Sequence, residues 1–179
     1  MKREKLTQLL QEYFPLSEEE RTYKTQMLVF VQENELCFER SLEKGHITAS
    51  AWLLNKEGSH ALLMHHAKLG LWCQLGGHCD GDPDPLAVAM KEASEESGIL
   101  AIRQVENSIF DIDIHPIPEG KGVKAHYHYD VRFLLQVESD EEFKINHEAK
   151  ELRWIAKDQD LLPTGALSVT RMFNKWSRL

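Results

Sequence analysis

Three glutamates lie close together in one short segment of this chain. Glu92, Glu95 and Glu96 belong to the run Lys91-Glu92-Ala93-Ser94-Glu95-Glu96-Ser97-Gly98-Ile99. On a helix, with about 100° of rotation per residue, their carboxylates share one arc of about 100°. Like charges at these spacings repel one another, which favours either a bound divalent cation or a plain solvated acidic face. Carboxylates on a rigid helix suit Mg²⁺ or Mn²⁺, but the bare spacing of the three glutamates by itself favours the solvated acidic face.

Residues at both ends of this segment support a helix. Asp84 can cap the first turn, Pro85 suits a first-turn position, and Gly98 fits the C-terminal exit. The apolar residues Leu86, Ala89, Met90 and Ala93 occupy a neighbouring face of the same helix. The pattern predicts a helix that buries one side and presents carboxylates on another.

The segment from Gly77 to Ile99 resembles the Nudix box, Gly-x5-Glu-x7-Arg-Glu-U-x-Glu-Glu-x-Gly-U, where U is a bulky apolar residue. Two positions depart from the pattern, because Pro83 stands at the early Glu and Lys91 at the Arg. The chain is thus similar to the Nudix hydrolase family over the box, and plausibly from about residue 46 to about 175.

The resemblance implies a metal-dependent hydrolase with a defined set of site residues. Its substrate would be a nucleoside diphosphate linked to another moiety, or a similar small phosphorylated metabolite, cut at a pyrophosphate bond. The expected metal ligands, for Mg²⁺ or Mn²⁺, are Glu92, Glu95, Glu96 and the carbonyl of Gly76. The expected catalytic residues are Glu95, Glu96 and Glu148, with Glu95 and a later carboxylate, Glu148 or Glu151, as alternative general bases.

The two departures leave other functions open. Asp82 or Asp84 could pair with Lys91 in place of the missing Glu, although a lysine offers a point charge where an arginine offers a planar fork. A catalytically weak Nudix-like domain that binds or senses a nucleotide is the main alternative function. An isoprenoid diphosphate isomerase is a third function, in which Cys73 or Cys79 would have to supply the catalytic thiol.

The expected substrate contacts are Trp72, His78, His126, His128 and Asp130. His126, His128 and Asp130 alternate along one segment and would share a face of a strand. The alternative is a half-buried strand with a polar outer face, and for Trp72 a core position. Zinc bound by Cys73, His78 and Cys79 with His65 and His66 fits poorly, because the cysteine spacing differs from that of structural zinc sites.

The pattern of apolar residues predicts an α/β (α+β) sandwich in which helices flank a mixed β-sheet. Strands are expected at residues 47–54, 61–66, 109–114, 126–135 and 152–155, with the first two forming a hairpin and a closing helix over 166–179. We divide the chain into an N-terminal helical extension, residues 1–43, and a Nudix-like catalytic domain, residues 44–179. The extension carries a capping box at Ser17 and Glu20. Its apolar residues should pack on the domain beside the substrate cleft, or else form a homodimer interface.

Charge and composition limit the partners. A net charge of −8 opposes binding to long nucleic acid, whose recognition depends on clustered Lys and Arg. No apolar run reaches the roughly 20 residues that span a bilayer, so no membrane partner is expected. The three cysteines suit reduced thiols. These observations predict a cytoplasmic protein, and the resemblance implies a small phosphorylated metabolite or nucleotide as its partner.

Overall fold

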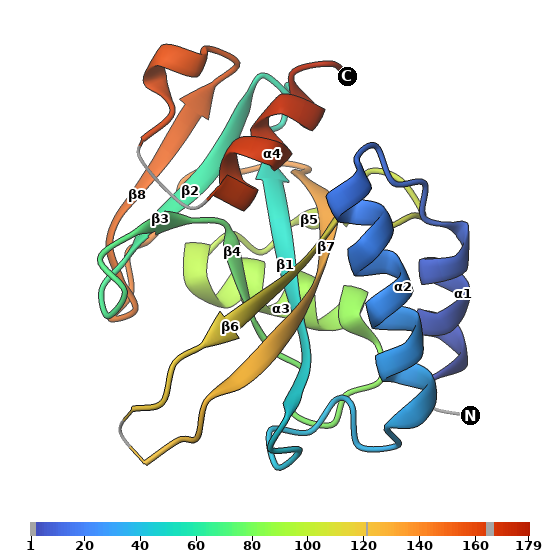
Figure 1. The fold of residues 1–179 in the computed structure, drawn as a ribbon. Helices are drawn as coiled ribbons and strands as arrows, with labels where there is room; N and C mark the ends of the chain where they lie inside the picture. Colours follow the sequence, from blue (N-terminus) through green and yellow to red (C-terminus); the bar gives the residue numbers. More distant parts are fainter. Residues whose placement is uncertain (1–2, 121, 164–166) are drawn as a thin grey trace.

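The computed structural model describes residues 3–120, 122–163 and 167–179. Within them, one eight-stranded mixed sheet runs through the molecule, with helices on both faces (Figure 1). The strands are β1 Gly45–Leu54, β2 His60–His66, β3 Trp72–Cys73, β4 Leu75–His78, β5 Ile102–Gln104, β6 Asp111–Ile117, β7 His126–Val137 and β8 Ala149–Ala156. The helices are α1 Glu4–Glu12, α2 Glu18–Glu33, α3 Pro85–Ser97 and α4 Leu167–Trp176, with a short 3-10 turn at Gln159–Leu161.

Strands β1 and β7 are the centre of the sheet. They run parallel in a register from Gly45↔Tyr127 to Leu54↔Gln136. Strand β1 pairs antiparallel with β4 in its middle and with β2 at its end, and β7 pairs antiparallel with β6 and then β5. Strand β2 also pairs with β3 and β8. The register therefore brings β4, β1, β7 and β6 side by side.

The two faces of the sheet are covered by different helices. On one face, Ile47, Ala49, Val131 and Phe133 belong to a large core that also contains residues of α1, α2 and α3. On the other face, Trp52, Leu54 and Leu134 pack with Val169, Met172, Phe173 and Trp176 of α4 in a second core. This layering confirms the predicted sandwich of helices around a mixed sheet.

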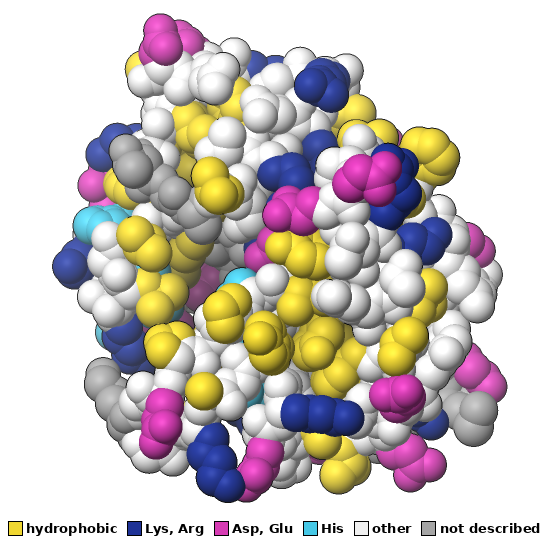
Figure 2. Space-filling model, in the orientation of Figure 1, with side chains coloured by type: hydrophobic (Ala, Val, Ile, Leu, Met, Phe, Trp, Pro, Cys, Tyr) yellow, Lys and Arg dark blue, Asp and Glu magenta, His cyan; other side chains and the backbone are white. Residues whose placement is uncertain are grey.

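The N-terminal helices pack on the sheet domain. Leu6, Leu10, Met27, Phe30 and Val31 are buried in the same core as the strands. The Phe30 ring stacks on Tyr129 of β7 with centroids 3.9 Å apart. Figure 2 shows hydrophobic side chains gathered along this seam between α2 and the β6–β7 pair.

The expectation of helix throughout residues 1–43 is correct only in part. Helix α2 ends at Glu33, and turns fill the stretch from there to β1. The Ser17 half of the expected capping box forms, because Ser17 Oγ accepts from the Glu20 amide at 3.2 Å. The Glu20 carboxylate accepts from the amide of Leu16.

A buried network of ion pairs joins α2, α4, β6 and β7. Lys175 of α4 donates to Glu20 of α2 at 2.9 Å and to Asp111 of β6 at 2.7 Å. Arg132, in the interior of β7, contacts Asp111, Asp113 and Asp130. Although burial raises the pKa of Asp111, the charges of Arg132, Arg171 and Lys175 together with a hydrogen bond from Arg171 outweigh it and hold that pKa below its usual value. The network therefore fixes the extension to the closing helix.

The predicted strands are all present, and their lengths differ modestly from the expected ones. Strands β3, β4 and β5 were not predicted, since each has only two to four residues. The start of the predicted closing helix, Ala166, lies outside the described residues, and the described part is helical from Leu167.

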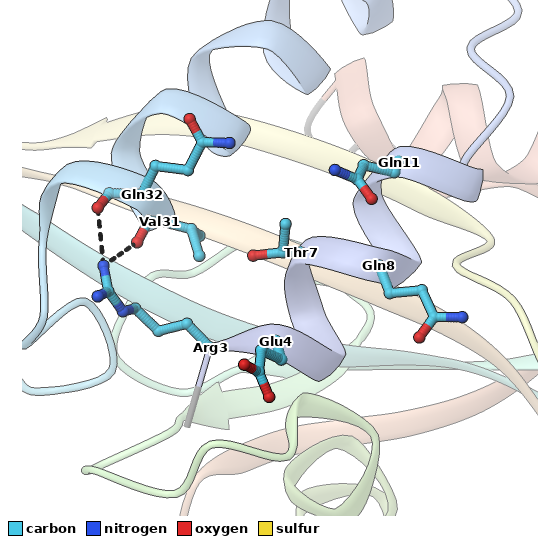
Figure 3. A pocket seen from close by; sticks show the side chains of 7 residues that line it. All are labelled: Arg3, Glu4, Thr7, Gln8, Gln11, Val31 and Gln32. Carbon is cyan, nitrogen blue, oxygen red and sulfur yellow. Dashed lines mark hydrogen bonds between the residues drawn. The ribbon is translucent and has the colours of Figure 1, made fainter. Parts of the chain in front are cut away.

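Two further features of the described chain concern its surface. None of the described helices combines the length and the apolar character needed to cross a membrane. A shallow groove lies between α1 and α2, where Arg3 donates to the carbonyls of Val31 and Gln32 (Figure 3). Because its lining comes from the extension alone, this groove is separate from the glutamates of α3.

Candidate active site

Helix α3 presents the predicted glutamates, and its two ends are fixed as the sequence predicts. The Asp84 side chain accepts from the Ala87 amide, Pro85 occupies the first position, and Gly98 adopts the left-handed conformation at the C-terminus. Asp84 also binds Lys5 of α1 at 2.6 Å. The N-terminal extension therefore contacts the first turn of the helix that carries the glutamates.

Two of the three glutamates face strand β4. Glu96 is 4% exposed, and its Oε2 accepts from the Gly76 amide at 2.8 Å. A Cβ added to Gly77 would lie 2.6 Å from the Glu92 carboxyl carbon. The glycine pair thus leaves room for two carboxylates against the strand, which explains why the segment needs a residue without a side chain at position 77.

The third glutamate lies at the edge of this group. The Glu95 side chain is 60% exposed, and its Oε2 lies 3.3 Å from Lys91 Nζ. Lys91 also lies 3.5 Å from Glu92 Oε1. Lys91 therefore pairs with the glutamates themselves, and the suggested pairing with Asp82 or Asp84 is not found among the described residues. Asp84 is taken by Lys5 and the helix cap, and Asp82 accepts from the Asp84 amide.

Glu96 is an unusual carboxylate in its surroundings. Burial, together with the charges of Glu92, Glu148 and Glu95, raises its pKa to about 8, against one backbone hydrogen bond from Gly76 that lowers it. Among the described residues, Glu96 forms no ion pair with a lysine, arginine or histidine. A buried carboxylate that lacks a compensating side-chain cation and has further carboxylates beside it fits a divalent metal ion, whose preferred ligands are such oxygens.

Of the later carboxylates, Glu148 comes nearest to the site. Its charge raises the pKa of both Glu92 and Glu96. The loop before it is attached to the end of α3, since Asn146 donates to the Glu95 carbonyl and also accepts from the Glu148 amide. Glu151, the other candidate base, accepts from Arg153 on the surface of β8.

The expected substrate residues fall into two places. Trp72 of β3 is half-buried, stacked on the His65 ring at 5.2 Å, with the Arg153 guanidinium 4.7 Å from its ring. Asp130 of β7 is buried and accepts from Thr48, Ser50 and Arg132. Gln74 donates to the same carboxylate at 3.3 Å. The Asp130 carboxylate therefore holds these four side chains together on one face of the sheet.

His78, His126 and His128 come together at one end of the sheet, with two histidines that are not among the expected substrate contacts. His46 of β1 is the register partner of His128, and His115 of β6 is the partner of His128 on the other side. The alternation of His126, His128 and Asp130 was the available signal. His46 can be placed beside His128 only when the pairing of β1 with β7 is known. That pairing joins residues 82 positions apart, such as Thr48 and Asp130.

The cysteine hypotheses gain no support from the geometry. Burial raises the pKa of the Cys73 thiol to about 12, and burial likewise raises that of Cys79. Both thiols therefore stay protonated near neutral pH, which disfavours a catalytic role. Of the imagined cysteine and histidine zinc set, His78 alone lies in the metal-sized side-chain group found among residues of the described ranges.

Comparison with known sequences gives two matches. The family model of the NUDIX domain matches residues 44–174. A probable DHNTP pyrophosphohydrolase of Lactococcus lactis subsp. cremoris is 36% identical over 67 residues, which are 36% of this chain and 39% of that protein. This chain thus matches well under half of the length of that relative.

Solved structures share the fold at low sequence identity. A C. elegans Ap4A hydrolase in a binary complex has a TM-score of 0.59 at 18% identity, covering 74% of this chain and 95% of its own. A MutT protein from Methanosarcina mazei Go1 has a TM-score of 0.59 at 21% identity, covering 76% and 96%. The NUDIX domain of Shewanella oneidensis NrtR, complexed with ADP ribose, has a TM-score of 0.53 at 15% identity, covering 76% and 88%.

These matches agree with the box at Gly77–Ile99 and with the helix and sheet that carry it. The resemblance seen in the sequence is confirmed, and the chain belongs to the NUDIX domain family.

Proposed function

We propose that this chain is a metal-dependent pyrophosphohydrolase of the Nudix type. The observation that supports it most is the buried Glu96 carboxylate, which lies among Glu92, Glu95 and Glu148 without a side-chain cation of its own in the described chain. Such a group is costly unless a divalent ion neutralises it. Mg²⁺, or Mn²⁺ in its place, would neutralise the substrate phosphates and lower the pKa of a bound water.

In this proposal the residues of α3 and β4 hold the metal and the phosphates. Glu92, Glu95 and Glu96 supply carboxylate oxygens, and the Gly76 carbonyl is a further ligand. The Gly76 amide holds Glu96 in place at 2.8 Å. Because the helix is capped at Asp84 and Gly98, these oxygens keep their positions while substrate binds.

The general base is proposed to be Glu148. It is close enough to raise the pKa of Glu96, and the Asn146 hydrogen bonds attach its loop to α3. Glu95 is the alternative base, although Lys91 Nζ already lies 3.3 Å from its carboxylate. Glu151 is less suitable, because Arg153 occupies it.

The substrate class is proposed to be a nucleoside diphosphate derivative or a similar small phosphorylated metabolite. Relatives and neighbours named for DHNTP, Ap4A and ADP ribose agree with this class. Trp72 offers an aromatic face on the sheet, already stacked on His65, and is proposed to contact the base or another planar group. Asp130 would act by holding Gln74 and Ser50 in place.

A nucleotide-binding domain with little turnover remains the second candidate. The specific observation in its favour is Lys91, whose ammonium lies 3.3 Å from Glu95 and 3.5 Å from Glu92 and competes with a metal ion for both. Such a domain would bind nucleotides without cutting them.

Measuring the release of phosphate and nucleotide in the presence of Mg²⁺ distinguishes the hydrolase from the nucleotide-binding domain. Nucleoside diphosphate sugars, dinucleoside polyphosphates, nucleoside triphosphates and isoprenoid diphosphates would be tested as substrates, with binding measured by calorimetry on the same compounds. Turnover of at least one compound that stops in excess chelator supports the hydrolase. Tight binding without turnover of any compound would support the binding domain and contradict the proposal.

A further inference from the structure

Five histidines meet at one end of the sheet, on the face that also carries α4. They come from four adjacent strands: His78 from β4, His46 from β1, His126 and His128 from β7, and His115 from β6. Near the middle of the face seen in Figure 2, only small histidine surfaces are visible. We call these five residues the histidine cluster. Strands with an alternating polar face do not require five imidazoles at one place.

Three of the rings form a nearly regular triangle. The ring centroids of His46, His78 and His128 are 5.1, 4.9 and 4.9 Å apart. One nitrogen from each ring lies within 4.8 Å of the others. A tetrahedral ion at about 2.0–2.1 Å from each nitrogen needs separations of roughly 3.4 Å, so small ring rotations would bring all three into coordination.

His46 gives independent evidence for a ligand. The side chain is 3% exposed, yet neither of its ring nitrogens has a hydrogen-bond partner within the described part of the chain. An unpartnered buried polar atom costs about 1–3 kcal/mol, and native proteins rarely leave one in place. A purely structural histidine at this position would be expected to donate to a carbonyl or carboxylate. A metal ion would satisfy one of the two nitrogens directly.

The other two histidines of the cluster, His126 and His115, each donate from Nδ1 to an oxygen, and this contact orients the ring. His126 Nδ1 lies 2.8 Å from the Lys124 carbonyl, and His115 Nδ1 lies 3.0 Å from Asp113 Oδ2. Such contacts fix the tautomer that carries a lone pair on Nε2, as in the outer shell of metal sites. His126 Nε2 then lies 3.2 Å from His128 Nε2. His126 is thus available as a fourth ligand.

We propose that His46, His78 and His128, with His126 as the fourth ligand, bind one Zn²⁺ or a similar late first-row transition metal ion. Imidazole suits these metals, whereas Mg²⁺ prefers the oxygens of α3. The site is separate from the glutamates, because successive side chains of a strand point to opposite faces and Gly77 meets Glu92 on the other side of β4 from His78. The three histidines expected to contact substrate thus hold a metal in this inference.

Such an ion would affect the stability of the sheet. The ion would join β4, β1 and β7 next to the Gly76–Gly77 pair that holds Glu96 and Glu92. Zinc would then raise the free energy of unfolding and fix the strand against which the catalytic helix packs.

The test uses the 179-residue chain with Glu92→Gln and Glu96→Gln, so that zinc binding by the carboxylates of α3 is weakened. After removal of metal by a chelator, Zn²⁺ stoichiometry would be measured by competition with a chromophoric chelator, and Co²⁺ would be added as a spectroscopic probe. We expect one Zn²⁺ per chain, a rise in melting temperature and the visible absorption of tetrahedral Co²⁺. Absence of zinc binding by this folded parent would overturn the proposal.

Variants then assign the ligands. His78→Gln and His128→Gln, each in that parent, should weaken zinc binding by more than about tenfold and abolish the Co²⁺ spectrum. His147→Gln is the matched control, because that side chain is 86% exposed and outside the cluster. Using two partly exposed ligands avoids dependence on the buried His46. Zinc affinity unchanged in both cluster variants, or lost equally in His147→Gln, would contradict the site.

Discussion

The Gly76 amide donates to Glu96 Oε2 at 2.8 Å and thereby joins strand β4 to the helix that carries the glutamates. The bond places an ionisable carboxylate in a site that is 96% shielded from solvent, next to a strand that cannot move without moving the helix. The position, burial and charge of Glu96 all follow from this contact between β4 and α3, and each can be tested separately.

The pH dependence of stability should report on Glu96. Burial raises its pKa to about 8 in the folded chain, above the usual value near 4.5, so its contribution is complete below pH 4.5 and is lost as pH rises through about 8. In excess chelator, Glu96→Gln should therefore gain stability relative to wild type between pH 5 and 9, by at most about 1.4 kcal/mol per pH unit. Urea unfolding of both proteins across this range measures it. Parallel profiles would show that the Glu96 carboxyl titrates normally.

Adding Mg²⁺ should reverse that loss in the wild type. A divalent ion favours the ionised carboxylates, so the melting temperature of the wild type should rise more at pH 8 than at pH 5. The same addition should raise that of Glu96→Gln less. An equal rise in both proteins would place the stabilising ion elsewhere.

Gly77→Ala tests the space beside Glu92. The added Cβ would lie 2.6 Å from the Glu92 carboxyl carbon, which must move, while the backbone conformation at Gly77 accepts alanine. Because displacement by about 1 Å can cost roughly a hundredfold, we expect a large fall in kcat/KM with a small change in melting temperature. Gly120→Ala is the control, since no described residue other than its chain neighbours lies within 4 Å of its added Cβ. Equal kinetics of the two variants would mean that the position of Glu92 is unimportant.

The buried ion network should be necessary for stability. Lys175→Met would leave Glu20 and Asp111 without their shared cation and should cost about 3–5 kcal/mol. Lys124→Met is the matched control, because its partner Glu43 and Lys124 itself are each more than 70% exposed. That variant should change the free energy of unfolding by less than about 1 kcal/mol. Similar losses in both would show that burial of the network contributes nothing.

The N-terminal helices should be part of the folding unit. Phe30→Ala removes a buried ring stacked on Tyr129 and should cost about 3–5 kcal/mol, whereas Phe14→Ala, at an 80% exposed ring, should stay within about 0.5 kcal/mol. Denaturant unfolding measures both. If Phe30→Ala is as mild as Phe14→Ala, the extension is a weakly attached segment and deleting residues 1–43 should be tolerated.

Local sequence signals predicted the parts of the fold that depend on local physics. Asp84, Pro85 and Gly98 predicted both ends of α3, and runs of apolar residues predicted β1, β2, β6, β7 and β8. Strands β3 and β4 escaped because two to four residues around Gly76 and Gly77 carry no periodicity. Strand pairing, in contrast, is a property of distant segments.

The residues of the site divide in the same way, into those that local sequence predicts and those that depend on contacts between distant segments. The glutamates followed from helical spacing and from the resemblance of the box, since all of them lie within five residues. The pairing of Lys91 with Glu95, and of Asp84 with Lys5, depended on which side chains the packed helices bring within reach. His46 and His115 joined His128 only through the register of β1, β7 and β6, which the sequence does not reveal.

The central claim is that the carboxylates of α3 bind the metal that hydrolysis needs. Its most direct measurement is kcat at saturating Mg²⁺ for Glu96→Gln and Glu92→Gln, on the best substrate of the panel, with the exposed Glu119→Gln as control. The account predicts a fall of at least about a hundredfold in both glutamine variants, an intact fold by circular dichroism, and wild-type turnover in the control. Near-normal turnover by both Glu92→Gln and Glu96→Gln would contradict it.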